Sequence, residues 1–150
     1  MMFVPPLGVL LEASGKTAAN WESEKQISIP TGLFKFLVQL AIATSDFNER
    51  DYLKENPDVN DAIKMGDIES AKLHYAGYGY FEGRMGALPD VDEAWYLKVY
   101  PDVAEAVRKR QISSGAEHFR VVGVKEGRSP SAAYDSAAAK WKAALRSMNA

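Results

Sequence analysis

The sequence predicts an all-α protein built from two tandem repeats. Compared with itself at a shift of 44 residues, the chain aligns 46–84 with 90–128 without gaps, and 16 of the 39 aligned pairs are identical. Apolar residues in each unit recur at intervals of three and four, which is the spacing of one helix face. No segment alternates polar and apolar residues for long enough to suggest a sheet. We therefore expect two three-helix units, 46–89 and 90–133, that share one core, because a single unit of this size is marginal alone.

Residues 1–45 are predicted to form an N-terminal arm. The stretch 12–32 is polar and reads as loosely structured, and Thr31 is placed to cap a helix over about 32–44. Its segment 33–43 is apolar nearly all round apart from one lysine and one glutamine, so something must cover it. We expect it to pack on the repeats or on a second copy of the chain, and an interfacial membrane helix is the alternative.

Each unit is predicted to open with two short helices. In the first unit Asp46 stands three residues before Glu49, which is the spacing of a capping box, and Pro57 suits the first turn of the second helix. The second unit repeats these residues as Asp90, Glu93 and Pro101. Gly66 is suited to end the second helix of the first unit, whereas Arg110 takes its place in the second, so the two connections are expected to differ.

A third helix is predicted to close each unit. Ser70 and Ser114 are placed as its N-caps, and Glu117 stands at the capping-box position of the second. Its inner face is expected to be Ala71, His74, Tyr75 and Tyr78 in one unit, and Gly115, His118, Phe119 and Val122 in the other. Gly79 and Gly123 are expected to end it in the left-handed conformation. The Glu-Gly-Arg triplets at 82–84 and 126–128 then predict tight turns.

The C-terminal segment is predicted to form an amphipathic helix over about 131–148. The first residues of this helix belong to the second repeat, and 134–150 is the part of the chain that follows the repeats. Its apolar spacing is formed by Tyr134, Ala138, Trp141, Leu145 and Met148, and its wet side by Lys140, Lys142 and Arg146. Three cations are too few for a track along nucleic-acid phosphates. We therefore interpret this segment as a docking or oligomerisation helix.

Composition excludes several function classes. The 18 basic and 20 acidic side chains give a net charge of −2, so a nucleic-acid binder is not expected. Without cysteine there is no disulfide, thiolate metal site or cysteine nucleophile, and two histidines leave little for a metal centre. No catalytic motif is present, and we expect neither an enzyme nor a bound cofactor or metal. The apolar N-terminus lacks a positive n-region, so we expect a cytoplasmic protein, with secretion without a cleavable signal as the alternative.

The chemically active side chains of the repeats have structural and functional interpretations. His74 and His118 are either core histidines bonded to backbone or paired ligands or general bases, and the predicted apolar face favours the first. Arg84 and Arg128 are expected to hold each unit together by reaching back to Asp58 and Asp102 or to a helix C-terminus, and a ligand-binding charge pair is the alternative. Glu82 and Glu126 are interpreted as turn contacts, because no second carboxylate is placed at a glycosidase-like separation.

Aromatic residues are dense, and three of them, Tyr80, Phe81 and Trp95, fall outside the inward stripes. Such aromatics can offer a stacking surface to a sugar or to a protein. The candidate interaction surface is Leu33, Phe34, Phe36, Leu37, Leu40, Tyr80, Phe81, Trp95, Trp141 and Leu145.

The motif order resembles a known bacterial repeat. It stands here as Tyr52-Leu53-Lys54-Glu55-Asn56-Pro57-Asp58-Val59, Ser70, His74-Tyr75 and Gly79-Tyr80-Phe81-Glu82-Gly83-Arg84, and the second unit departs from it at Tyr100, Phe119 and Val121-Val122. That repeat accompanies glycosyltransferases and methyltransferases of surface-polysaccharide pathways and also occurs in secreted calcium-binding surface proteins. The resemblance implies an interaction module linked to the bacterial cell surface, and it does not imply an enzyme.

Three functions follow as hypotheses. The first is a non-catalytic interaction or scaffold module that binds another protein, including a second copy of itself, through the 33–43 helix and the C-terminal helix. The second is a glycan-binding module that uses exposed aromatics. The third is a small enzyme that uses the His/Asp/Arg set.

Overall fold

The computed structural model describes residues 3–17, 19 and 21–146, and within them it is helical without a strand, as predicted. The arm contains α1 (Leu7–Glu12), the 3-10 turn η1 (Trp21–Ser23) and α2 (Thr31–Thr44). The stretch between α1 and α2 has little regular structure where it is described, which agrees with its polar sequence. No described helix combines the length and apolarity needed to span a bilayer.

Each repeat folds as predicted into three consecutive helical segments. The first unit consists of α3 (Glu49–Glu55), α4 (Pro57–Met65) and α5 (Ala71–His74), which continues directly as the π-helical turn η2 (Tyr75–Gly79). The second consists of α6 (Glu93–Val99), α7 (Pro101–Arg108) and α8 (Gly115–His118), which continues as the π-helical turn η3 (Phe119–Gly123) and as α9 (Val124–Glu126). The chain ends in the 3-10 turn η4 (Ala132–Tyr134) and in α10 (Asp135–Arg146); Met148 lies outside the described residues.

The expectation of one shared core is wrong, because each unit buries a core of its own. The first core is Tyr52, Val59 and Ala71, and the second is Tyr96, Val103 and Phe119. The larger helix contacts of the described residues all lie within one unit or with its flanking helix, as α2 does against η2. The physical reason is that the third helix of each unit folds back over the first two and covers its tyrosine completely.

The capping positions differ from those predicted from the sequence. Asn48 and Asp92 cap α3 and α6, so the helices begin at Glu49 and Glu93 and the Asp46 and Asp90 capping boxes do not form. This follows because a side chain directly before the first helical residue reaches the free amides better. Similarly, Pro30 precedes α2, and Thr31 is its first residue and not its cap.

The predicted starts of both second helices and the predicted end of α4 are confirmed, whereas the expected difference between the two connections is not found. Pro57 and Pro101 begin α4 and α7, where a missing amide hydrogen is tolerated. Gly66 ends α4 in the left-handed conformation with φ 83°. Arg110 adopts a similar φ of 58° after α7, and it is the one residue other than glycine with positive φ in the part of the chain described. The sequence change from glycine therefore keeps the conformation and adds strain.

The third helices begin as predicted and end differently. Ser70 and Ser114 accept hydrogen bonds from the amides of Leu73 and Glu117, which confirms both caps. The Glu117 carboxylate, however, accepts from Ser113 and does not complete the capping box on Ser114.

The π-helical turns shift the register, so Tyr78 and Val122 are exposed instead of facing inward. Gly79 and Gly123 lie within these turns without positive φ, and the left-handed glycines are Gly83 and Gly127, at the predicted tight turns. The glycines of the π-helical turns are therefore explained by close packing and not by chain reversal.

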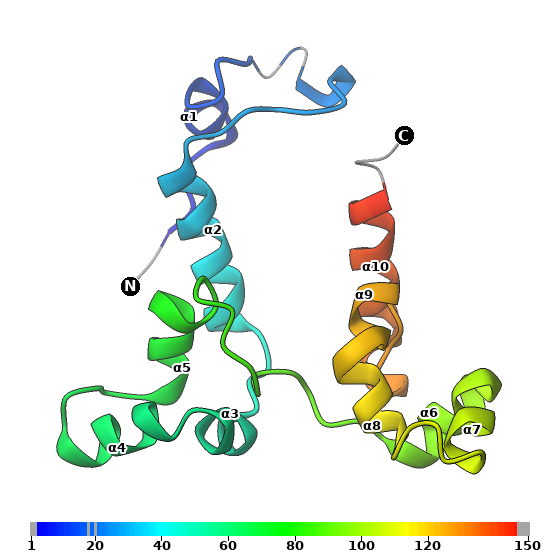
Figure 1. Ribbon diagram of the computed structural model, residues 1–150. Helices are drawn as coiled ribbons and strands as arrows, with labels where there is room; N and C mark the ends of the chain where they lie inside the picture. The colour runs from blue at the N-terminus through cyan, green and yellow to red at the C-terminus, as the bar shows by residue number, and fades with distance from the viewer. Residues whose placement is uncertain (1–2, 18, 20, 147–150) are drawn as a thin grey trace.

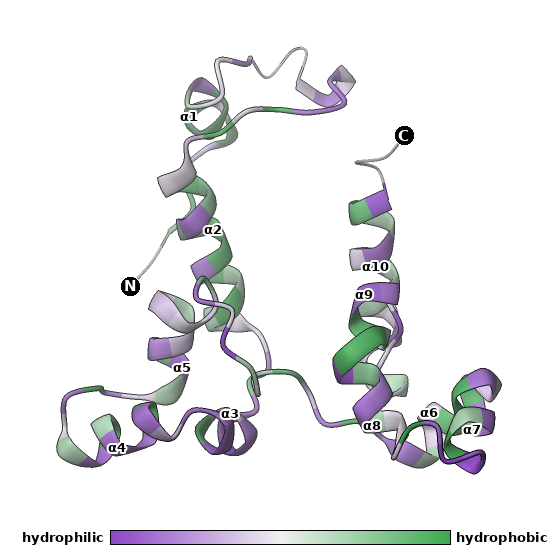
Figure 2. Cartoon of the chain, in the orientation of Figure 1, coloured by the Kyte–Doolittle hydropathy of each residue, from purple (hydrophilic) through white to green (hydrophobic). Residues whose placement is uncertain are grey.

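The two flanking helices extend away from the repeats. Figure 1 shows α2 rising beside the first unit and α10 rising beside the second, with the repeats along the lower edge. In Figure 2 the colouring of α2 is mostly that of hydrophobic residues, whereas α10 alternates between hydrophobic and hydrophilic. The fold therefore presents one apolar and one amphipathic helix at the margins of the repeats.

Candidate functional site

A tyrosine, a histidine and a glycine meet inside each unit. The Tyr52 hydroxyl lies 3.0 Å from Nδ1 of His74, and the Tyr96 hydroxyl lies 3.0 Å from Nδ1 of His118. A Cβ on Gly79 would fall 2.1 Å from the Tyr52 hydroxyl oxygen, so this position has no room for a side chain. Burial raises the pKa of Tyr96 to about 12 and raises that of Tyr52 as well.

These contacts decide how the histidines are used. Each histidine is half-buried and bonded to the tyrosine of its own unit, where the sequence had predicted a backbone partner. No group of three or more metal-ligating side chains exists among the residues that the structure describes. The arrangement positions the third helix of each unit on its first helix, and neither histidine lines the two depressions described below.

The Asp, Glu and Arg side chains of the Glu-Gly-Arg turns form a second contact set in each unit. Arg84 lies 2.7 Å from both Asp58 and Glu82, and Arg128 lies 2.7 Å from Asp102. Arg128 also contacts Glu126 and stacks 4.8 Å from the centre of the Tyr100 ring.

The electrostatics of these groups agree with their geometry. Hydrogen bonds from the arginines lower the pKa of Asp58 and of Asp102, and the carboxylates raise the pKa of both arginines. Because all the members of each set satisfy one another, the set connects the closing turn to the second helix of its unit. This arrangement is the predicted structural interpretation of the pairs.

At one position of the repeat, a different residue in each unit forms a hydrogen bond with the backbone of the same closing segment. Asn56 is buried and donates to the backbone carbonyls of Tyr52 and Met85. At the corresponding position of the second unit, the Tyr100 hydroxyl accepts a hydrogen bond from the amide of Ser129, and Ser129 corresponds to Met85. In the sequence, Asn56 and Tyr100 are only a difference between the two units. Their corresponding hydrogen bonds are visible only in the structure.

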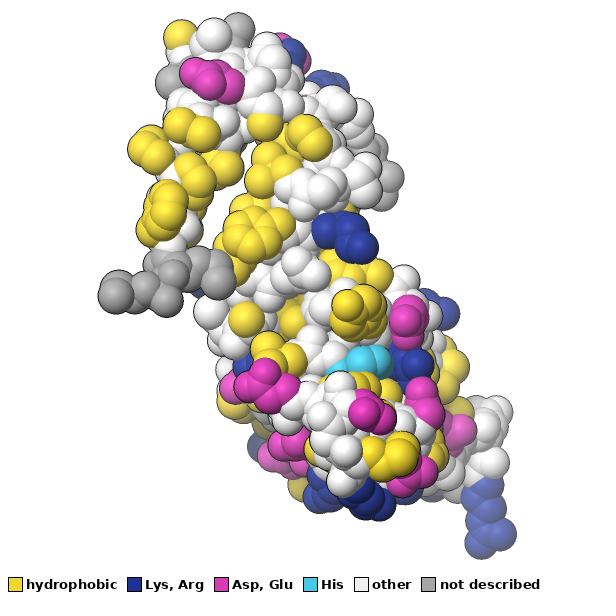
Figure 3. All heavy atoms as spheres, turned by 90° about the vertical axis from the view of Figure 1, so that its left-hand side faces the viewer, with side chains coloured by type: hydrophobic (Ala, Val, Ile, Leu, Met, Phe, Trp, Pro, Cys, Tyr) yellow, Lys and Arg dark blue, Asp and Glu magenta, His cyan; other side chains and the backbone are white. Residues whose placement is uncertain are grey.

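The apolar helix α2 remains largely uncovered, although it packs against η2. Leu33 and Leu40 are half-buried, whereas Phe34, Phe36 and Leu37 are 54%, 46% and 38% exposed. Figure 3 shows hydrophobic side chains gathered on the upper half of that face of the molecule, over α1 and α2, with charged side chains below them. Exposed apolar side chains gathered in this way mark an interaction site more often than a solvent face.

The aromatics predicted as a stacking surface do not form one face. Tyr80 is exposed beside the first unit, and Phe81 is half-buried with the Lys35 ammonium 4.7 Å from its ring centre. Trp95 packs instead against the core of the second unit, edge-on to Tyr100. The structure therefore brings Phe81 to Lys35 of α2, with Tyr80 against Phe81, and places Trp95 in the second unit.

The C-terminal helix α10 presents the second exposed apolar pair. Trp141 and Leu145 are one helical turn apart and are 65% and 58% exposed, while the Lys142 stem lies against Gly127. The preceding turn is attached at its base, because the Tyr134 hydroxyl donates to Asp46 at 2.8 Å. The turn before this helix is thus attached to the repeats, whereas Trp141 and Leu145 are exposed on the helix itself.

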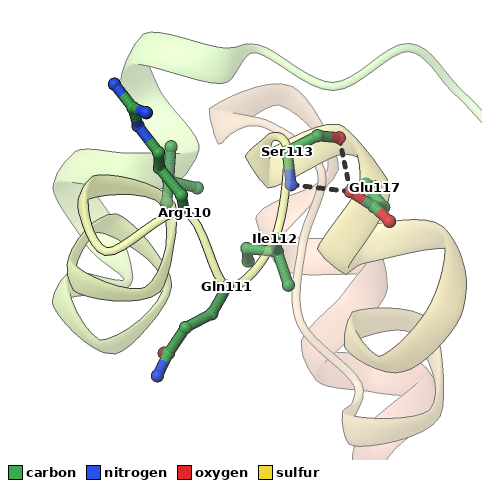
Figure 4. Close-up of a pocket in the computed structure, with 6 residues that line it drawn as sticks. Arg110, Gln111, Ile112, Ser113 and Glu117 are labelled. Carbon is green, nitrogen blue, oxygen red and sulfur yellow. Dashed lines mark hydrogen bonds between the residues drawn. The ribbon is translucent and has the colours of Figure 1, made fainter.

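A shallow depression of about 440 Å³ follows the loop between α7 and α8. Figure 4 shows that Arg110 and Gln111 point away from the hydrogen-bonded Ser113 and Glu117. The hydrogen bonds from Ser113 lower the pKa of Glu117. With its polar side chains either bonded to one another or turned outward, this depression shows no convergent set of groups for catalysis.

A second depression, of about 390 Å³, lies between the two repeats, and we call it the inter-repeat groove. Its apolar lining is Met85, Leu88, Pro89, Val91 and Val121. Its charged lining is Asp51, Glu55, Asp90 and Glu117, together with Arg120. Sequence reasoning missed this groove, because its walls come from α3, from the connection between the units and from α8 with η3, whose separation along the chain hides their proximity.

Comparison with known proteins adds no assignment: no protein-family model matches the chain, and no curated protein and no solved structure is found to be similar to it.

Proposed function

We propose that the chain is a non-catalytic interaction module that binds other proteins, including a second copy of itself, through α2 and α10. The observation that supports this best is the exposure of Phe34, Phe36 and Leu37 on one helix and of Trp141 and Leu145 on the other. Large apolar side chains lose favourable burial when they remain in water, and their concentration on two protruding helices is typical of interfaces. The resemblance noted in the sequence supports a role linked to bacterial cell-surface or polysaccharide biology. The compartment that we propose for the protein itself is the cytoplasm.

The contacts inside the repeats support a structural use of their polar residues. The histidines are bonded to tyrosines, the arginines to carboxylates, and neither histidine lines either of the two depressions described above. A small enzyme using the His/Asp/Arg set would need at least one of these groups directed at a substrate cavity. We therefore rank an enzyme below an interaction module.

Glycan binding is a second candidate function, favoured by one specific observation. Tyr78 and Tyr80 are 67% and 47% exposed at the end of the first unit. Their counterparts Val122 and Val124 provide no aromatic surface, so a sugar would bind only the first unit. Titration with bacterial surface polysaccharides tests this candidate, because binding predicts perturbed tyrosine ring signals in the proton spectrum and an unchanged spectrum contradicts it.

Light scattering across a wide range of protein concentration tests the leading proposal. We expect the mass of the wild-type chain to rise with concentration, and the double variants Phe34→Ser/Leu37→Ser and Trp141→Ala/Leu145→Ala to associate less. Met65→Ala is the matched control, because Met65 is 71% exposed on α4 and lies outside both helices. A wild-type chain that stays strictly monomeric at every concentration would overturn the self-association proposal.

A further inference from the structure

The inter-repeat groove combines an apolar lining with an acidic rim, and no element of the described chain fills it. We propose that this groove receives α10 of a second copy of the chain. This inference rests on the proposed self-association and names the two surfaces that meet in it.

Charge complementarity is the first argument. The groove presents four carboxylates, from Asp51, Glu55, Asp90 and Glu117. Two arginines reduce this charge, since Arg50 contacts Asp51 and Asp90 at its edge and Arg120 lies in its wall. The net charge of these side chains is still negative, so the groove favours a cationic partner and disfavours an acidic one.

The helix α10 has the opposite charge and the matching apolar side chains. Its sequence holds Lys140, Lys142 and Arg146 against a single Asp135, so its net charge is positive. Trp141 and Leu145 project from the same segment and are among the most exposed large apolar side chains of the tail. A volume of about 390 Å³ lies in the range of pockets that enclose a small organic molecule, so it can admit an indole ring and a neighbouring aliphatic chain.

The groove of the same chain is out of reach of α10. The Pro130 carbonyl accepts the Asp92 amide at 3.0 Å, and the Ser129 amide donates to Tyr100 at 2.9 Å, so the segment before α10 is held against the second unit. From that attachment α10 runs away from the repeats (Figure 1). The occupant must therefore come from another molecule.

The two surfaces are different, so the contact is heterologous. Two copies that exchange α10 reciprocally form a closed two-fold dimer that contains this contact twice, whereas a one-way contact continues into a ring or an open chain. Either assembly leaves α2 uncovered by this contact, and α2 then remains available to a further partner.

Complementary charge reversal tests the proposal in the full-length chain. Glu55→Lys changes the groove, and lysine at the last residue of α3 suits a helix C-terminus, so the fold should be retained. Lys140→Glu changes the donor helix. We expect each variant alone to associate about tenfold more weakly than wild type, and their equimolar mixture to regain affinity, because the reversed groove then meets the reversed helix.

The controls separate this inference from the proposed function. Asp61→Lys makes the same charge change on α4, away from the groove, and should leave association near the wild-type level. If wild type associates but Glu55→Lys and Lys140→Glu are unaffected, or if their mixture regains nothing, the groove assignment is overturned while self-association stands. If wild type is monomeric, the proposed function itself fails.

Discussion

The close approach of Gly79 to Tyr52 gives the sharpest prediction for stability. Replacing Gly79 with alanine would place a Cβ 2.1 Å from the Tyr52 hydroxyl oxygen and 3.3 Å from Cδ2 of Tyr75. The tyrosine cannot retreat easily, because it is fully buried and packs 5.3 Å from the Phe47 ring, centre to centre. The hydroxyl must therefore move, and its hydrogen bond with His74 is lost.

The expected cost follows from three contributions. Overpacking a tight core site costs about 1 to 3 kcal/mol. Losing the tyrosine–histidine hydrogen bond costs about 1 kcal/mol, and alanine in place of glycine returns about 1 kcal/mol through helix propensity. We therefore expect Gly79→Ala to lower the free energy of unfolding by about 1 to 3 kcal/mol, measured by urea denaturation followed by circular dichroism.

The neighbouring Gly77 supplies a matched control. A Cβ at Gly77 meets no atom within 4 Å and its φ is not positive, so Gly77→Ala should be neutral or stabilising. Removing the hydroxyl in Tyr52→Phe should make Gly79→Ala less costly than in the wild-type background, because the nearest remaining atoms lie at 3.3 Å. Equal stability of the Gly77→Ala and Gly79→Ala variants would refute this account of the repeat glycines.

Three further predictions concern conformation, pH and a buried amide. Arg110→Gly should stabilise the chain by up to about 1 kcal/mol in thermal unfolding, because glycine removes the strain of positive φ, and a destabilised variant would contradict this. The pKa of Asp102 is lowered by Arg128, so its contribution is present above its unfolded pKa of about 4 and is lost as pH falls. Asp102→Asn should consequently flatten the acid side of the stability profile, and an unchanged profile would show that the pair is not coupled to folding. Asn56→Ala should cost about 1 to 3 kcal/mol in urea unfolding, because it removes the buried amide that donates to the Tyr52 and Met85 carbonyls, and a variant as stable as wild type would show that these bonds are dispensable.

Several local features of the repeats could be predicted from the sequence because they depend on neighbouring residues, although the capping boxes at Asp46 and Asp90 could not. The proline starts, the serine caps and the glycine of each closing turn are set by backbone chemistry within a few residues. The pairs of Asp58 with Arg84 and of Asp102 with Arg128 were also predicted, because the repeat presents both partners twice.

Features that depend on register or on distant segments escaped prediction. The π-helical turns add a residue to the helix and moved Tyr78 to the surface, which a spacing of 3.6 residues cannot show. The separate cores reflect how fully each third helix covers Tyr52 or Tyr96, and this is a matter of packing. The inter-repeat groove arises between units, so the internal similarity of the units holds no information about it.

Because the two units have separate cores, the exposed side chains of the flanking helices are not needed to complete either core. Since each unit buries its own tyrosine, neither unit requires α2 or α10 to complete its core, although α2 packs on η2. The exposed apolar side chains of the two helices, such as Phe34 and Trp141, are therefore not used in the packing of the described fold. An interaction module explains their exposure directly, because those side chains would be buried in the complex.

The emission of Trp141 tests the central claim most directly. A Trp21→Phe/Trp95→Phe variant retains only this tryptophan, which is 65% exposed in the single chain. The account predicts that its emission shifts to shorter wavelength and that its quenching by acrylamide falls as protein concentration rises, in parallel with the increase in mass. An emission maximum typical of exposed tryptophan and unchanged quenching throughout a range in which the mass increases would contradict burial of α10, and the absence of any mass increase would contradict self-association itself.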